Sequence, residues 1–190
     1  MGADELAVDP VEAAHRLLGA TLTGRDVTAT IVEVEAYGGV PDGPWPDPAA
    51  HSYRGPTGRN TVMFGPPGRA YIYLSYGIHW CLNFVCREAG HGAGVLIRAL
   101  EPTAGVSTMI NRRRQQDLRM LCAGPGRLGQ ALAVTRELNG KCIDVAPFSL
   151  TAASTRGRVV CGPRIGISKA VERPWRFGLA GSRYLSRPFR

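Results

Sequence analysis

The chain has 190 residues, of which 44% are hydrophobic, and a formal net charge of +8 at pH 7. This length supports one compact domain, and we expect residues 1–190 to form it, with residues 1–8 flexible. The positive charge favours a polyanionic partner. No run approaches the roughly 18 to 20 apolar residues that cross a bilayer. Because the N-terminal segment MGADELAVDP is acidic, unlike a secretion signal, we expect a cytoplasmic protein that does not bind membranes.

The cysteines and lysines exclude several kinds of chemistry. The five cysteines are odd in number and lack CxxC or Cys/His spacing, so we expect reduced thiols, no disulfide framework and no metal site. Only Lys141 and Lys169 are lysines, against 21 arginines, and few amines are therefore available to form a Schiff base. The arginine bias suits phosphate and base contacts, but codon usage in a GC-rich genome explains it equally well.

The first predicted element is a helix over residues 9–19, with Asp9 as N-cap, Pro10 at its first position and Gly19 as its stop. A strand follows over residues 27–37. Alternation along it places Glu33, Glu35 and Tyr37 on one face, opposite a valine-rich face. The polar face is either the solvated side of an edge strand or part of a site.

Residues 38–68 form a long segment rich in Gly and Pro, which predicts either a functional loop or a mobile surface loop. Residues 71–86 then predict a β-hairpin whose tip displays Tyr76. Asn83 lies inside the apolar return strand and needs hydrogen-bond partners. The next strand, residues 94–100, contains Arg98, whose burial requires a carboxylate; Glu33, Glu35 and Glu101 are the candidates.

The remaining chain predicts supporting structure. We expect a helix over residues 101–121, a short helix over residues 124–134, a turn and strand over residues 138–145, and a connection over residues 151–160. The segment RIGISK, residues 164–169, places two basic side chains around a glycine where backbone could approach a ligand.

Several ordered blocks now resemble one family. They are IVEVEAY, AAHSYRG, TGRNTVMFGPPG, YIYLSYGIHWCLN, VLIRALEP, LCAGPGRLGQALAV, PRIGISKA, RPWRF and GSRYLS. Their succession from Asp9 onward resembles the 3-methyladenine DNA glycosylase family of the alkyladenine type. The resemblance implies an α+β fold, a single compact domain with a curved antiparallel β-sheet, peripheral helices and a protruding β-hairpin, similar to the C-terminal domain of some formyltransferases.

The resemblance also implies a pocket for a base that has been rotated out of duplex DNA. Tyr37, His51 and Tyr73 match the rings that sandwich this base, which suits cationic 3-methyladenine and 7-methylguanine. Asn83 matches the residue that excludes the amino group of guanine. His79 stands where some members carry tyrosine, a change that could alter the preference for deaminated purines such as hypoxanthine. The loop before His51 is longer than we expect for the family.

The implied reaction is hydrolysis of the N-glycosidic bond by an activated water. Glu35 matches the general base, Arg98 matches the arginine that positions the water and keeps Glu35 ionised, and the carbonyl of Ile165 matches a further water ligand. The product would be an abasic site without a lyase step, and no cofactor or metal is implied.

The implied partner is double-stranded DNA that contains damaged purines, bound by a monomer. Tyr76 matches the wedge that fills the gap left by the base, and Thr57, Arg59 and Lys169 match backbone contacts. The alternative is a non-catalytic nucleic-acid-binding or lesion-binding domain of the same fold. A metal-dependent hydrolase built on His51, His79 and His91 lacks a ligand motif.

Overall fold

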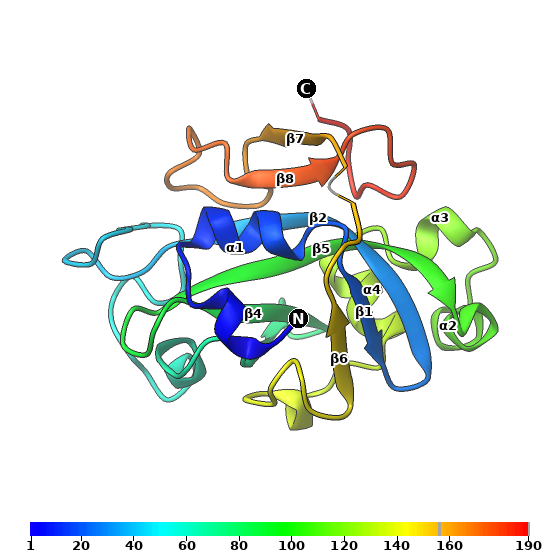
Figure 1. Cartoon of the computed structure of the whole chain (residues 1–190), viewed down its shortest axis with the longest axis horizontal. Helices are drawn as coiled ribbons and strands as arrows, with labels where there is room; N and C mark the ends of the chain where they lie inside the picture. The colour runs from blue at the N-terminus through cyan, green and yellow to red at the C-terminus, as the bar shows by residue number, and fades with distance from the viewer. Residues whose placement is uncertain (156, 190) are drawn as a thin grey trace.

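The computed structural model describes residues 1–155 and 157–189. An antiparallel sheet with the strand order β3-β4-β5-β2-β1-β6 curls through the molecule, and β8 joins it beside β2 and pairs with β7 (Figure 1). The strands are β1 (Thr21–Gly24), β2 (Val27–Tyr37), β3 (Ala70–Ser75), β4 (His79–Cys86), β5 (Ala93–Ala104), β6 (Phe148–Thr151), β7 (Val159–Gly162) and β8 (Arg176–Leu179). The predicted α+β domain with a curved antiparallel sheet is confirmed.

Short helices surround this sheet. They are α1 (Pro10–Leu17), α2 (Val106–Arg113), α3 (Leu118–Leu121) and α4 (Pro125–Ala131), with 3₁₀ turns η1 (Ala3–Leu6), η2 (Thr61–Phe64) and η3 (Arg136–Leu138). The predicted start of α1 is confirmed, since the Asp9 carboxylate accepts from the amides of Val11 and Glu12. No helix in the part of the chain that the structure describes is long and apolar enough to cross a membrane.

Strand β2 is the centre of the sheet because three strands pair with it. One edge pairs with β5, while the other edge is shared between β1, at residues 27–30, and β8, at residues 33–35. The register with β5 shifts on both sides of Glu33, so that Val32 and Arg98 have no directly opposite partner. This irregularity puts Ile31 and Val34 into the same core.

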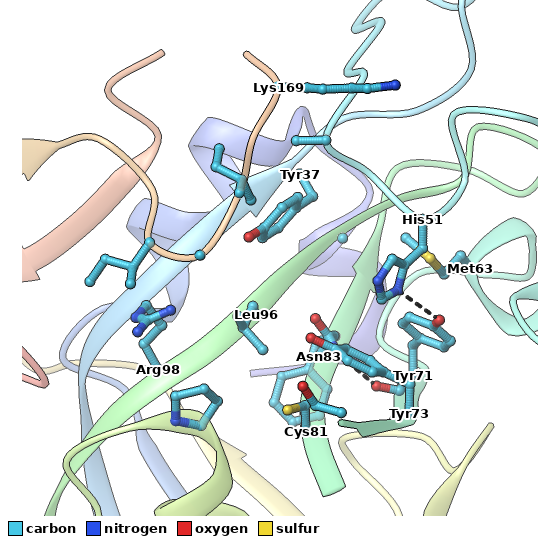
Figure 2. A pocket seen from close by; sticks show the side chains of 18 of the residues that line it. Tyr37, His51, Met63, Tyr71, Tyr73, Cys81, Asn83, Leu96, Arg98 and Lys169 are labelled. Atoms are coloured by element: carbon cyan, nitrogen blue, oxygen red, sulfur yellow. Dashed lines mark hydrogen bonds between the residues drawn. The ribbon is translucent and has the colours of Figure 1, made fainter. Parts of the chain in front are cut away.

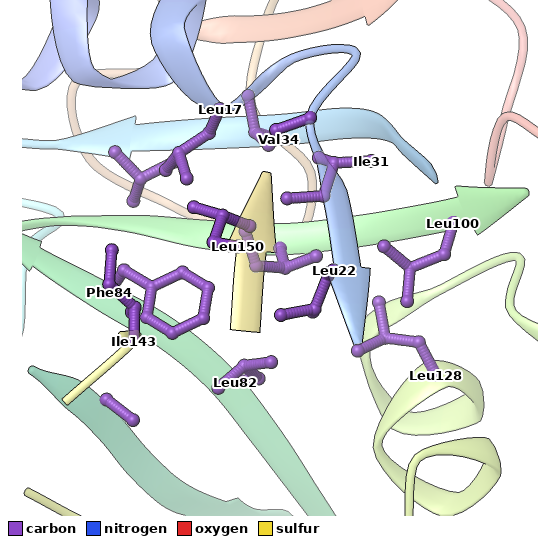
Figure 3. Packing of buried hydrophobic residues seen from close by; sticks show 14 of the residues in the cluster. Leu17, Leu22, Ile31, Val34, Leu82, Phe84, Leu100, Leu128, Ile143 and Leu150 are labelled. Atoms are coloured by element: carbon purple, nitrogen blue, oxygen red, sulfur yellow. The ribbon is translucent and has the colours of Figure 1, made fainter. Parts of the chain in front are cut away.

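The two faces of the sheet have different contents. On β3, β4 and β5, one set of alternating residues, including Leu82, Phe84 and Ile97, packs into the hydrophobic core with α1 and α4 (Figure 3). The other set, including Tyr73, Asn83 and Arg98, faces a cavity. Alternate residues of the same three strands therefore face the core and the cavity.

Two sequence predictions differ from the structure. The helix expected over residues 101–121 begins only at Val106, because β5 continues to Ala104 by pairing with β2. Residues 138–145 contain only the last residue of η3 and an isolated bridge from Cys142 to Arg69. The strand lies later, at β6, where β1 offers a pairing edge. Within residues 1–8, for which flexibility stays a prediction, Ala3–Leu6 form η1, and the Leu6 side chain is fully buried.

Helix α4 offers a test of how tightly it packs on β4. A methyl group at Gly129 would lie 2.1 Å from the carbonyl oxygen of Trp80, whose backbone is held in β4. One at Gly126 would lie 2.7 Å from Cγ of His79, an exposed side chain at the end of that strand. Although alanine favours helix, we expect Gly129→Ala to destabilise the fold by about 1–3 kcal/mol through overpacking. Gly126→Ala is the matched control and should lower the thermal midpoint less, because the exposed His79 side chain can move away from the new methyl group. Equal midpoints for both variants would contradict this packing.

Candidate functional site

A cavity of about 630 Å³ lies on the sheet face opposite the core (Figure 2). Strands β2, β3, β4 and β5 supply its floor, and two loops, at residues 48–54 and 165–169, supply its walls. Its lining mixes aromatic, polar and apolar side chains: Tyr37, His51, Tyr71, Tyr73, Tyr76, Asn83, Leu96, Arg98, Ile165 and Lys169, among others. The structure thus brings together most of the residues that the sequence singled out.

Two carboxylates and two guanidiniums lie buried beneath this cavity. Arg98 lies 3.3 Å from both Glu33 and Glu35, and Arg176 donates to Glu33 at 2.7 Å. Both Glu side chains are fully buried. The sequence left three carboxylates as candidates for Arg98, and the structure selects Glu33 and Glu35. The two guanidiniums balance the formal charges of the two carboxylates, which offsets the cost of burying these groups.

Glu35 receives hydrogen bonds from groups that themselves line the cavity. The amide of Ile165 donates to Oε1 at 2.7 Å, and the Tyr37 hydroxyl donates to Oε2 at 2.9 Å. Since a carboxylate oxygen has two lone pairs, Oε2 retains capacity for one more donor. The contact of Ile165 with Glu35 is through its N–H, whereas the resemblance assigned a role to its carbonyl.

The aromatic side chains of the cavity contact one another at its mouth. The His51 ring packs edge-on against Tyr73, with centroids 4.6 Å apart, and its Nδ1 lies 3.0 Å from the Tyr71 hydroxyl. Partial burial lowers the pKa of His51, and the positive charge of Arg59 lowers it further. The ring is therefore neutral at pH 7.

The phenols of the cavity keep their protons. Burial raises the pKa of Tyr37, and the adjacent Glu35 charge raises it further. Burial also raises the pKa of Tyr73 and of Tyr71. All three rings therefore stay neutral and present electron-rich faces over the whole physiological pH range.

Asn83 satisfies the requirement that a buried amide find partners. Its Nδ2 donates to the Tyr71 carbonyl at 3.0 Å, and the side chain is only 8% exposed. This bond holds the amide in one orientation at the cavity wall.

His79 is not among the residues that line the cavity, so its influence on base preference stays a prediction. It lies on the same face of β4 as Cys81 and Asn83, but the strand begins beyond the cavity's edge. Its exposed ring rests instead against Gly126 of α4, where the missing side chain leaves room.

The tip of the β3–β4 hairpin is apolar and exposed. Tyr76 is 90% exposed and Ile78 is 70% exposed, and Tyr76 has a φ of +51°, which is uncommon for a residue other than glycine. The same Tyr76 also borders the cavity. A displayed ring beside a cavity has no evident role in the packing of the domain.

The three predicted backbone contacts lie in different places. Lys169 is exposed and lines the cavity. Arg59 is exposed and donates to the Leu74 carbonyl of β3 at 3.3 Å. Thr57 lies outside the cavity lining and bonds to the buried Asn60 through both its amide and its hydroxyl.

A buried ion pair that the sequence did not reveal joins the two loops of the cavity wall. Arg164 donates to both oxygens of Asp47, at 2.5 and 2.9 Å, and neither side chain is exposed. Burial alone would raise the pKa of Asp47, but the hydrogen bonds and charge of Arg164 hold it below its usual value. The long segment before His51 is therefore anchored rather than loose.

Among residues 1–155 and 157–189, no three His, Cys, Asp or Glu side chains are placed to hold a metal ion together.

Tyr71 is a cavity residue that sequence reasoning missed, although its alternation with Tyr73 on one strand was a usable signal.

Comparison with known proteins gives a consistent result over nearly the whole chain. A model of the methylpurine-DNA glycosylase family matches residues 4–183. A relative from Nitrosospira multiformis is 59% identical over 186 residues, covering 98% of this chain and 93% of the relative. One from Rhizobium meliloti is 55% identical over 186 residues, covering 98% and 96%.

A third relative, from Rhodopseudomonas palustris, is 56% identical over 178 residues, covering 94% of this chain and 84% of the relative. All three carry the name "Putative 3-methyladenine DNA glycosylase". The resemblance noted in the sequence is confirmed, and this chain belongs to the methylpurine-DNA glycosylase family.

Proposed function

We propose that this protein is a DNA repair glycosylase that hydrolyses the bond between deoxyribose and an alkylated purine, leaving an abasic site. The observation that carries the proposal is a fully buried Glu35, paired with Arg98, beneath a cavity walled by neutral aromatic rings. The substrates are 3-methyladenine and 7-methylguanine in duplex DNA, with deaminated purines as further candidates. Membership of the family and the names of the relatives support this assignment.

Base recognition would depend on the charge of the lesion. Alkylation makes 3-methyladenine and 7-methylguanine cationic, and a cation is attracted to the face of an aromatic ring by about 0.5–2 kcal/mol per contact. Tyr37, Tyr73 and the neutral His51 supply such faces. A purine must leave the stack to enter the cavity, at a cost of a few kcal/mol. Tyr76, which is exposed and borders the cavity, would occupy the vacated space.

Hydrolysis would use Glu35 as a general base toward a water that attacks the sugar C1′. The free lone pair on Oε2 can accept the proton of that water, and Arg98 can donate to its oxygen. The carboxylate charge would also stabilise the positive character that the sugar develops as the base leaves. Because Tyr37, Arg98 and Ile165 separate Glu35 from the cavity, water must pass between these side chains.

No amine is positioned for a lyase step in this scheme. Lys141 is not among the residues that line the cavity, and Lys169 lines it as an exposed side chain (Figure 2). Release of the base by water alone leaves the DNA strand intact.

The second candidate function is a binding domain without catalysis, which the basic charge and exposed Tyr76 would serve equally well. The buried carboxylate argues against it, since an acid near a phosphate-binding surface weakens binding unless it has another task.

Glu35→Gln tests the catalytic assignment. The glutamine oxygen can accept from the Ile165 amide, and its NH2 group can donate to the Tyr37 oxygen, but the side chain cannot take a proton. We therefore expect single-turnover release of 7-methylguanine to fall at least about 100-fold with lesion-DNA affinity nearly unchanged. Glu33→Gln is the matched control, because it removes an equally buried carboxylate that contacts Arg98 but not Ile165. If both variants fold and lose base release equally, the loss would come from disturbing the buried charge network and not from removing a general base.

Tyr76→Ala tests the wedge. Because the ring is 90% exposed, its removal should leave the thermal midpoint unchanged. Affinity for duplex DNA with one lesion should fall about tenfold, since stacking with bases contributes roughly 1–3 kcal/mol. Fluorescence anisotropy with intact and lesion duplexes measures this. Unaltered affinity would remove Tyr76 from the proposal.

His51 gives a prediction for pH. The pKa of His51 is lower in the folded than in the unfolded protein, so the unfolded chain takes up a proton first as the pH falls below about 6.5. Its contribution to stability is therefore present above that pH and lost in acid. Thermal melts from pH 7.5 to 5 should show a steeper loss of stability for the wild type than for His51→Gln. Parallel slopes would mean that His51 titrates as a solvated histidine.

A further inference from the structure

The ring of Tyr37 has charged groups on its side away from the cavity. The Arg164 guanidinium lies over this ring, 4.6 Å from its centroid, and is also 5.3 Å from the centroid of Trp175. Tyr37 lines the cavity, whereas Arg164 does not. The guanidinium therefore covers the back of the ring, and the face that remains for a ligand is the one turned to the cavity.

A lone cation in this position would oppose the recognition of a cationic base. The attraction between a cation and a ring comes from the negative potential of the ring face, and a positive charge on the opposite face reduces that potential. A base stacked at about 3.5 Å on the free face would lie roughly 8 Å from the guanidinium. In a partly desolvated cavity, one unpaired charge at that distance changes an affinity by roughly tenfold or more.

Asp47 removes this conflict in the structure. Its carboxylate binds Arg164 through two hydrogen bonds and also accepts from the amides of Gly38 and Ala49. Arg164 completes its bonding at the Ala36 carbonyl, and among the described residues nothing accepts from its Nε. The pair is thus sealed behind Tyr37 with no net charge.

We propose that Asp47 is a positioning residue that sets the preference for positively charged bases by neutralising Arg164 behind Tyr37. The inference rests on the proposed base-release function. A purely structural role for the pair would hold the loop at residues 46–51 in place but would affect cationic and neutral bases alike. The ratio between the two kinds of base separates these roles.

The test is a charge series measured with two duplexes, one carrying the cationic base 7-methylguanine and one carrying the neutral base hypoxanthine. Asp47→Asn leaves a buried positive charge, Arg164→Gln leaves a negative charge held by the Gly38 and Ala49 amides, and the double variant leaves none. Single-turnover efficiency is measured for each base at limiting enzyme, after circular dichroism has established which variants fold.

We expect the ratio of 7-methylguanine to hypoxanthine efficiency to fall about tenfold in Asp47→Asn, to rise in Arg164→Gln and to return to within about twofold of wild type in the double variant. The two single variants have opposite signs, so either one that folds decides the matter. Equal losses for both bases, with an unchanged ratio, would overturn the inference and leave the proposed function standing. A wild type that releases neither base would overturn both.

Discussion

The structure depends on the pairing of Arg98 with two buried carboxylates. Moving a charge out of water costs several kcal/mol, which is recovered only when opposite charges and hydrogen bonds replace the lost solvent. Arg98 alone would leave one negative charge in excess, and Arg176 supplies the second positive charge from β8. The irregular register of β2 and β5 is what lets Arg98 face Glu33 and Glu35 together. A regular ladder would have given a more uniform sheet and no such cluster.

The cavity exists because one sheet serves two purposes. Its core face is filled by aliphatic and aromatic side chains and supplies the stability, while its other face is left to polar and aromatic groups. Two loops that are far apart in the sequence close the cavity walls, and the Asp47–Arg164 pair connects them. Trp45 packs edge-on against Trp175 nearby, and Arg173 donates to the Pro46 carbonyl, so the same two segments meet at several points.

Sequence reasoning succeeded where the signal is local and failed where it is not. The cap at Asp9, the alternation of Glu33 and Glu35 and the hairpin that carries Tyr76 follow from short patterns, and the structure has each of them. The need of Arg98 for a carboxylate follows from the cost of burying a charge. Asp47, by contrast, sits among prolines in a segment without periodicity, and its partner is 117 residues away.

Other failures had the same origin. Strands β6, β7 and β8 have four residues each and exist because an edge was available to pair with them, which no local propensity encodes. The family resemblance gave His79 a role in base preference, whereas in the structure its ring lies against Gly126 of α4. The family resemblance suggested roles for individual side chains. The residues that hold those side chains in place were visible only in the three-dimensional structure.

The buried charge network can be completed only late in the synthesis of the chain. The partners that complete it, Ile165, Arg176 and Ser186, are translated after the strands that form the cavity floor. Until they emerge from the ribosome, Glu33 and Glu35 lie on an unpaired edge of β2 with Arg98 as their shared counter-ion. A chain interrupted before residue 164 would carry the Tyr76 hairpin and the aromatic wall but an unfinished centre. Such a product would lack the hydrogen bonds that the amides of Ile165 and Ser186 donate to the two carboxylates.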